Sequence, residues 1–241
     1  YWSRRTDTHD KSLYYVQHHI RHHQIQFIKF RQRYINFFIS LRNNDTRNSM
    51  KRENILLWGL AAASGLLMSV PYLVSHTGFL ALIGLIPLLC MERIATIQEK
   101  KHVWMYHYFS FVLWNTITTF WVCNATVGGG IFAILANSFQ MSVVFGLFRW
   151  SRRRFKGALP YIFLMTAWIA WERFYFDAEI SWPWLVLGNA FARSTGAIQW
   201  YEFTGTLGGS LWIWASNLSL FGILVSLSDG QQSYLHRERL L

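Results

Sequence analysis

The chain has 241 residues, of which 52% are apolar, 18% aromatic and 15% charged, and its formal net charge is +11. Soluble domains carry about a quarter charged residues, so this composition excludes an ordinary soluble globular protein. The charges gather before residue 53 and then in short clusters between apolar runs. Such clusters are typical of the loops of an integral membrane protein. We therefore expect a membrane as the partner of this basic chain, and no nucleic acid.

Residues 1–50 are basic and polar, unlike everything that follows. They contain no apolar centre ahead of a small-residue cleavage site, so they do not form a signal peptide. Residues 24–41 mix apolar and basic side chains that would suit an anionic membrane surface. However, Met50 followed by two basic residues and a long apolar run has the pattern of a natural start. We expect residues 1–50 to be an N-terminal extension that is non-native or disordered.

Six apolar segments follow, and most have the roughly 20 residues that a helix needs to cross a bilayer. Their polar members can be hidden against neighbouring helices. The sequence therefore predicts an all-α fold, a polytopic transmembrane helix bundle with about six spans. It forms a transmembrane domain over 51–228, followed by a cytoplasmic tail over 229–241. The expected spans are residues 54–75, 79–90, 103–125, 130–150, 158–176 and 207–227.

Basic residues occupy alternate loops between these segments. The loops around His76 and around residues 126–129 contain no Lys or Arg. Because cytoplasmic loops carry the excess of Lys and Arg, the pattern places both termini in the cytoplasm. The basic loop residues are Lys51, Arg52, Arg93, Lys100, Lys101, Arg149, Arg152, Arg153, Arg154, Lys156, Arg237 and Arg239.

The stretch from Asp177 to Thr206 then falls on the outer side. It contains Pro183 and several glycines, and non-helical backbone at membrane depth is tolerated only where it is buried in protein or lines a cavity. Tryptophan rings favour the interface between lipid and water. We therefore expect a re-entrant or interfacial segment before the last span, at the rim of an outward-facing cavity.

The polar and aromatic residues in and beside this stretch are the candidate substrate-binding residues. As an alternative to substrate binding, Glu172 would form an interfacial ion pair with Arg173. The tryptophans would then form only an aromatic belt around a turn. The residues near the next helix would bind a head group or cap that helix. The candidates are Glu172, Trp182, Pro183, Trp184, Asn189, Gln199, Tyr201 and Glu202.

Neither metal binding nor covalent catalysis is predicted from the sequence. Cys90 and Cys123 should lie near opposite membrane faces, so we expect packing roles and no disulfide. A grouping of acid, base and nucleophile is missing, and so are the internal repeats typical of transporters. Four histidines have helical spacing, but no acidic or Cys partner accompanies them. They are His18, His19, His22 and His23.

Four segments resemble the membrane part of the apolipoprotein N-acyltransferase family, especially its Bacteroidetes-type members: "FLALIGLIPLL", "VLWNTITTFWV", "ISWPWLVLGN" and "QWYEFTGTLGGSLWIWASNL". The resemblance covers residues 54–228. The family's acidic residue ahead of an aromatic–Pro–Trp turn corresponds to Glu172 with Pro183 and Trp184. The family's basic residue three positions after the acid is not matched, because Tyr175 holds that position.

The resemblance implies an enzyme of the bacterial inner membrane. Such enzymes transfer an acyl chain from phospholipid to the N-terminal amine of a lipoprotein's S-diacylglyceryl cysteine, so the expected partners are the phospholipid donor and the lipoprotein acceptor. The reaction proceeds through a thioester in a nitrilase-like domain, without a cofactor. That domain is not found in these 241 residues, so we expect a truncated membrane part that is inactive alone. The alternative is a non-catalytic membrane protein that binds lipid or acts as a scaffold.

Overall fold

The structure is a computed structural model that describes residues 46–178 and 182–238, all of whose regular elements are helices. The chain divides into two compact units, Tyr1–Ile55 and Leu56–Leu241. In the first unit, the described residues form the beginning of helix α2. The expected extension therefore lies outside the described residues, except for its last five. The histidines considered for metal binding also lie outside them.

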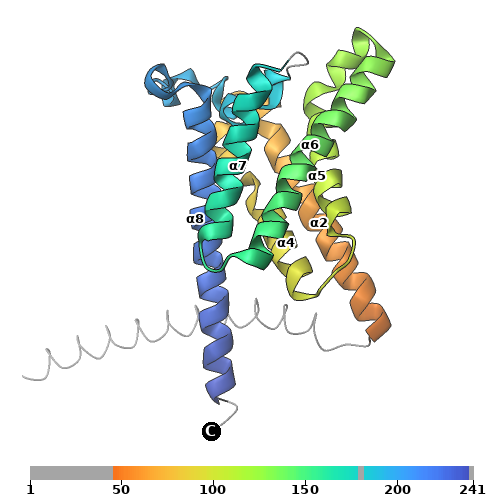
Figure 1. Cartoon of the computed structure of the whole chain (residues 1–241), viewed down its shortest axis with the longest axis vertical. Helices are drawn as coiled ribbons and strands as arrows, with labels where there is room; N and C mark the ends of the chain where they lie inside the picture. The colour runs from red at the N-terminus through yellow and green to blue at the C-terminus, as the bar shows by residue number, and fades with distance from the viewer. Residues whose placement is uncertain (1–45, 179–181, 239–241) are drawn as a thin grey trace, which may run out of the picture. The chain divides into compact units, whose positions relative to one another are not determined.

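Six longer helices and six short ones make up the described chain (Figure 1). The longer helices are α2 (Thr46–Leu73), α4 (Ile86–Ile97), α5 (Val103–Thr119), α6 (Val127–Arg154), α7 (Leu159–Phe176) and α8 (Tyr201–Glu238). The short ones are η1 (Gly78–Leu80), α3 (Ala81–Gly84), η2 (Phe120–Asn124), η3 (Pro183–Leu185), η4 (Leu187–Phe191) and η5 (Thr195–Ala197).

Four helical segments are long and apolar enough to cross a membrane, which confirms the expected class of fold. The count of six spans is not confirmed. The other two expected spans correspond to α5, which has 17 residues, and α7, which carries Glu172 and Arg173 near its end. Their crossing of the membrane stays a prediction. The four segments are Arg52–Leu73, Gly78–Ile97, Val127–Arg154 and Tyr201–Ser228.

Four helices of the second unit meet at a buried aromatic cluster. Helix α5 packs against α6, α6 against α7, and α7 against α8 (Figure 1). Each helix contributes one ring, and the ring centroids of successive contacts lie 5.3 to 6.1 Å apart. Edge-on and tilted contacts at such distances add about 0.5–1.5 kcal/mol per pair to the burial of apolar surface. The rings belong to Phe111, Phe145, Trp168 and Trp214, and all are at most 1% exposed.

The second candidate span is broken between α3 and α4, and an amide from α8 fills the break. Leu85 N–H donates to Oδ1 of Asn217 at 2.9 Å, and Nδ2 of Asn217 donates to the Ala81 carbonyl at 2.8 Å. Ser64 Oγ donates to the Gly84 carbonyl at 2.7 Å. Backbone groups at membrane depth need partners within the protein, so these bonds allow the break to exist there.

The bundle has two chemically different ends. We call the end with Lys100, Lys101, Arg149, Arg152 and Arg153 the basic end; it contains the α4–α5 and α6–α7 connections. The end that contains η2 and the α7–α8 connection carries exposed aromatic side chains, and we call it the aromatic end. They include Phe120, Trp121, Phe174, Trp184 and Phe203.

Candidate functional site

The segment from Trp182 to Trp200 connects α7 to α8 at the aromatic end and folds into three short 3-10 helices. Pro183 fixes the backbone at the start of η3. Asn189 Nδ2 donates to the Pro183 carbonyl at 2.9 Å, which closes the first part of the segment on itself. The result is a compact loop whose residues 185–188 are buried. The segment expected to have non-helical backbone therefore consists of short 3-10 helices and their connections, and its centre is packed within the protein.

Glu172 attaches this loop to α7. Its carboxyl group is 1% exposed, and its Oε1 accepts a bond from Trp168 Nε1 at 2.9 Å. The same oxygen accepts the backbone N–H of Leu187 at 2.8 Å. Arg173 points elsewhere and forms an exposed ion pair with Asp177. Glu172 thus holds the backbone of the loop at Leu187 in place inside the protein.

Two tyrosines and a serine hold the loop from other helices. Tyr72 Oη of α2 donates to the Val186 carbonyl at 3.0 Å, and Tyr201 Oη of α8 donates to the Gly188 carbonyl at 3.0 Å. The Gly188 N–H donates to Ser210 Oγ at 3.0 Å. Sequence reasoning singled out Tyr201 and missed Tyr72 and Ser210, because residues so distant in the chain give no local signal.

Gly188 is required where the loop meets α8. A Cβ atom at this position would lie 2.0 Å from the Thr206 carbonyl oxygen, well inside van der Waals contact. Helix α8 itself is interrupted at Gly205, whose φ of 65° and ψ of −174° are readily reached only by glycine. Gly188 and the glycines at the start of α8 therefore allow the backbone of the loop to approach the backbone of α8 closely.

The candidate residues fall into two groups. Glu172, Pro183, Asn189 and Tyr201 are brought together by the bonds that fold and anchor the loop, and the half-buried Trp182 starts the loop. The other three are exposed at the surface. Their substrate-binding roles stay predictions. The exposed residues are Trp184, Gln199 and Glu202.

Trp184 is the exposed aromatic residue that the anchored loop presents. Its side chain is 53% exposed, and its ring meets that of Trp121 edge-on at 5.5 Å. Gln199 Nε2 donates to the Thr195 carbonyl, which closes η5. Glu202 lies in the first turn of α8, where a negative charge favours the helix. Trp184 is thus the candidate residue best placed to contact lipid.

The described part of the chain was predicted to contain neither a metal site nor a disulfide. No group of three or more His, Cys, Asp or Glu residues is arranged there to hold a metal ion. Cys90 and Cys123 are free and half-buried. Cys90 lies on α4 and Cys123 on η2 at the aromatic end.

The fold and the anchored loop together define a polytopic α-helical membrane protein with an aromatic loop of short 3-10 helices packed at one end. The family profile described as the apolipoprotein N-acyltransferase N-terminal domain matches residues 64–219. The apolipoprotein N-acyltransferase of Chlorobaculum tepidum is 32% identical over 185 residues, which cover 73% of this chain. The chain belongs to the apolipoprotein N-acyltransferase family, as the sequence resemblance indicates.

The chain spans about a third of that curated relative, since the aligned region covers 33% of its length. No solved structure matches the chain. The family profile includes the anchored loop and the α3–α4 break with its partner Asn217.

Proposed function

We propose that this chain forms the membrane domain of a bacterial enzyme that N-acylates lipoproteins. In this proposal the fatty acyl chain comes from a phospholipid. Its acceptor is the N-terminal amine of a lipoprotein's S-diacylglyceryl cysteine, in the inner membrane. Family membership supports the proposal, and the C. tepidum relative is named an apolipoprotein N-acyltransferase.

The observation that carries the role of this chain is the anchored loop at the aromatic end. Bonds from α2, α7 and α8 hold its backbone, while Trp184 remains 53% exposed. Phe203, at the start of α8, is 87% exposed. Aromatic rings at the membrane interface pack against acyl chains while tolerating nearby water. The loop thus acts as the floor or lateral gate along which an acyl chain reaches the reacting centre.

The distribution of basic residues supports the orientation of this gate. Lys and Arg gather at the end where α4 and α6 finish, whereas the 74–78 and 120–126 connections contain none. The excess of basic residues marks the cytoplasmic side of membrane proteins. In our proposal the aromatic end therefore faces outward, and both termini are cytoplasmic.

Photo-crosslinking tests this role directly. The full chain is placed in nanodiscs with a phospholipid that carries a diazirine near the ester of its acyl chain, and labelled residues are mapped by mass spectrometry. Trp150 is a matched control, because it is 50% exposed on α6 near the basic end. We expect labelling around Trp184 that falls when a synthetic S-diacylglyceryl lipopeptide is added, with labelling around Trp150 unchanged.

Two results would contradict the proposal. If the lipopeptide lowers labelling equally around Trp184 and Trp150, the two lipids do not share a site at the aromatic end. If labelling occurs but the lipopeptide competes nowhere, the chain is better described as a non-catalytic lipid-binding or scaffold protein.

A further inference from the structure

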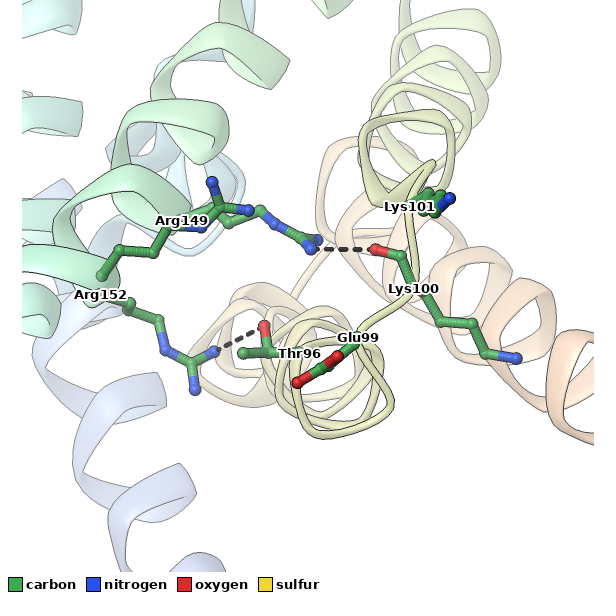
Figure 2. A pocket seen from close by; sticks show the side chains of 7 residues that line it. Thr96, Glu99, Lys100, Lys101, Arg149 and Arg152 are labelled. Atoms are coloured by element: carbon green, nitrogen blue, oxygen red, sulfur yellow. Dashed lines mark hydrogen bonds between the residues drawn. The ribbon is translucent and has the colours of Figure 1, made fainter.

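A cavity of about 580 Å³ opens at the basic end of the bundle, and Figure 2 shows side chains that line it. It lies between the end of α4, the connection to α5 and the last turns of α6. Cavities of this volume accommodate small ligands. Most of its lining residues are basic, which points to an anionic ligand. The lining residues are Thr96, Glu99, Lys100, Lys101, Arg149, Arg152 and Arg153.

A buried carboxylate behind the cavity positions two of the arginines. Glu92 is fully buried, and its Oε2 lies 2.9 Å from Nε2 of His107. Its Oε1 accepts a bond from Thr96 Oγ1 at 3.0 Å. Nη1 of Arg149 and Nη1 of Arg152 each lie 3.8 Å from a carboxylate oxygen. These distances are too long for hydrogen bonds, so Glu92 attracts both guanidinium groups without using their N–H donors.

The same two arginines are also held by neutral acceptors. Arg149 Nη2 donates to the Lys100 carbonyl at 3.1 Å, and Arg152 Nη1 donates to Thr96 Oγ1 at 3.5 Å (Figure 2). Each guanidinium has five N–H donors, so one such bond leaves most of them for a ligand. The two arginine side chains are also only about one-fifth exposed, at 20% and 18%. An anion between them would therefore be partly shielded from water, which strengthens its attraction.

The end of helix α6 alone does not explain this arrangement. Cations in a last helical turn interact favourably with the helix dipole, which accounts for a positive charge at Arg152, Arg153 and Arg154. It does not account for a buried Glu92 that aligns Arg149 and Arg152 beside a cavity. The Lys100 ammonium extends away from the two guanidinium groups (Figure 2). The binding elements are thus the arginine pair, with Lys101 and Arg153 adding positive charge.

We propose that this cavity binds a phosphate group through Arg149 and Arg152. Guanidinium forks bind phosphate oxygens in a bidentate manner, and basic pockets between transmembrane helices are suited to lipid head groups. The phosphate belongs either to an anionic phospholipid of the adjacent leaflet or to a free phosphate ion. This site lies at the opposite end of the bundle from the proposed acyl gate, and it does not depend on acyl transfer.

Native mass spectrometry of the full chain in detergent tests the proposal. Phosphatidylglycerol is titrated against phosphatidylcholine with the same acyl chains. Arg152→Gln should weaken phosphatidylglycerol binding about tenfold, as expected for the loss of charge-assisted hydrogen bonds. Arg154→Gln is the matched control. It removes the same charge from the same helix end, but Arg154 is exposed, stacks on Trp150 and does not line the cavity. It should weaken binding less than about twofold.

A second variant keeps the test decisive if Arg152→Gln disturbs folding. Glu99→Gln removes the one carboxylate in the lining and should tighten phosphatidylglycerol binding. A competition with inorganic phosphate, at constant ionic strength, then separates the two sources. Displacement of the lipid by millimolar phosphate identifies a site for the free ion, and no displacement identifies a head-group site; both support the proposal. Equal binding by Arg152→Gln and Arg154→Gln, or unchanged binding by Glu99→Gln, overturns it.

Discussion

The two ends of the bundle are each organised around one buried glutamate, but the two carboxyl groups bind different partners. At the aromatic end, Glu172 accepts bonds from the Leu187 backbone and the Trp168 indole. At the basic end, Glu92 contacts His107 and attracts Arg149 and Arg152. One acid therefore fixes the path of the chain, whereas the other fixes the positions of charges. The same residue type supports a rigid apolar surface in one place and a polar cavity in the other.

The largest expected effect comes from removing the acid that fixes backbone. Glu172→Ala leaves the Leu187 N–H and the Trp168 indole N–H buried without an acceptor. Each such loss costs about 1–3 kcal/mol, so for two of them the loop should open more easily by roughly 2–6 kcal/mol. Hydrogen-exchange mass spectrometry of residues 182–191 measures this opening. Glu172→Gln, which keeps one acceptor oxygen, should show less than half the effect, and unchanged exchange in Glu172→Ala would refute the anchoring role.

A second test measures the close packing of the loop backbone on α8 independently of the hydrogen bonds to Glu172. Gly188→Ala forces a methyl group to within 2.0 Å of the Thr206 carbonyl oxygen. Overpacking of this kind costs about 1–3 kcal/mol, and we expect a corresponding fall in the thermal unfolding midpoint in detergent. Gly196→Ala in the same segment is the control, because its Cβ would meet open space. Equal midpoints for the two variants would show that the loop does not pack on α8 as described.

A third test asks whether the two ends are independent. Glu92→Gln keeps the side-chain volume but removes the charge that holds Arg149 and Arg152. It should lower the free energy of unfolding by about 1–2 kcal/mol, because both arginine side chains are partly exposed. Hydrogen exchange of residues 182–191 should be the same in Glu92→Gln as in the unmodified chain. Combining Glu92→Gln with Glu172→Gln should give an additive effect within about 0.5 kcal/mol, since the two acids share no partner among the contacts described above. A larger coupling energy would mean that the ends communicate.

The smallest effect on stability is expected at the exposed tryptophan. Trp184→Ala removes one edge-on contact with Trp121 and should change the unfolding free energy by less than about 1 kcal/mol. In contrast, it should abolish the lipopeptide-sensitive part of the lipid crosslinking at the aromatic end. Trp150→Ala should leave that crosslinking intact. A large loss of stability in Trp184→Ala would instead assign this ring to the core.

Patterns along the chain predicted the helical class and membrane-spanning character of the fold, whereas the orientation and the roles of Glu172 and the "WPWLVLGN" segment stay predictions. These patterns did not predict which side chains form hydrogen bonds or ion pairs with one another across the bundle. Asn217 lies in the last apolar segment without a distinguishing pattern around it, yet its amide completes the backbone of α3 and α4. Glu92 and His107 lie 15 residues apart across a helix connection, a spacing with no local signal. Bundle helices carry polar groups for partners on other helices, so only the packed structure reveals those pairs.

The amide of Asn217 also sets an order of events in time. Asn217 is synthesised 132 residues after Leu85, whose backbone N–H donates to the Asn217 side-chain oxygen. At a synthesis rate of roughly 5–20 residues per second, the broken segment waits on the order of ten seconds for its permanent partner. During that interval the open carbonyl and N–H groups must be bonded to something transient, such as water in the insertion machinery. The second membrane segment can therefore be inserted early but becomes complete only when the last long helix arrives.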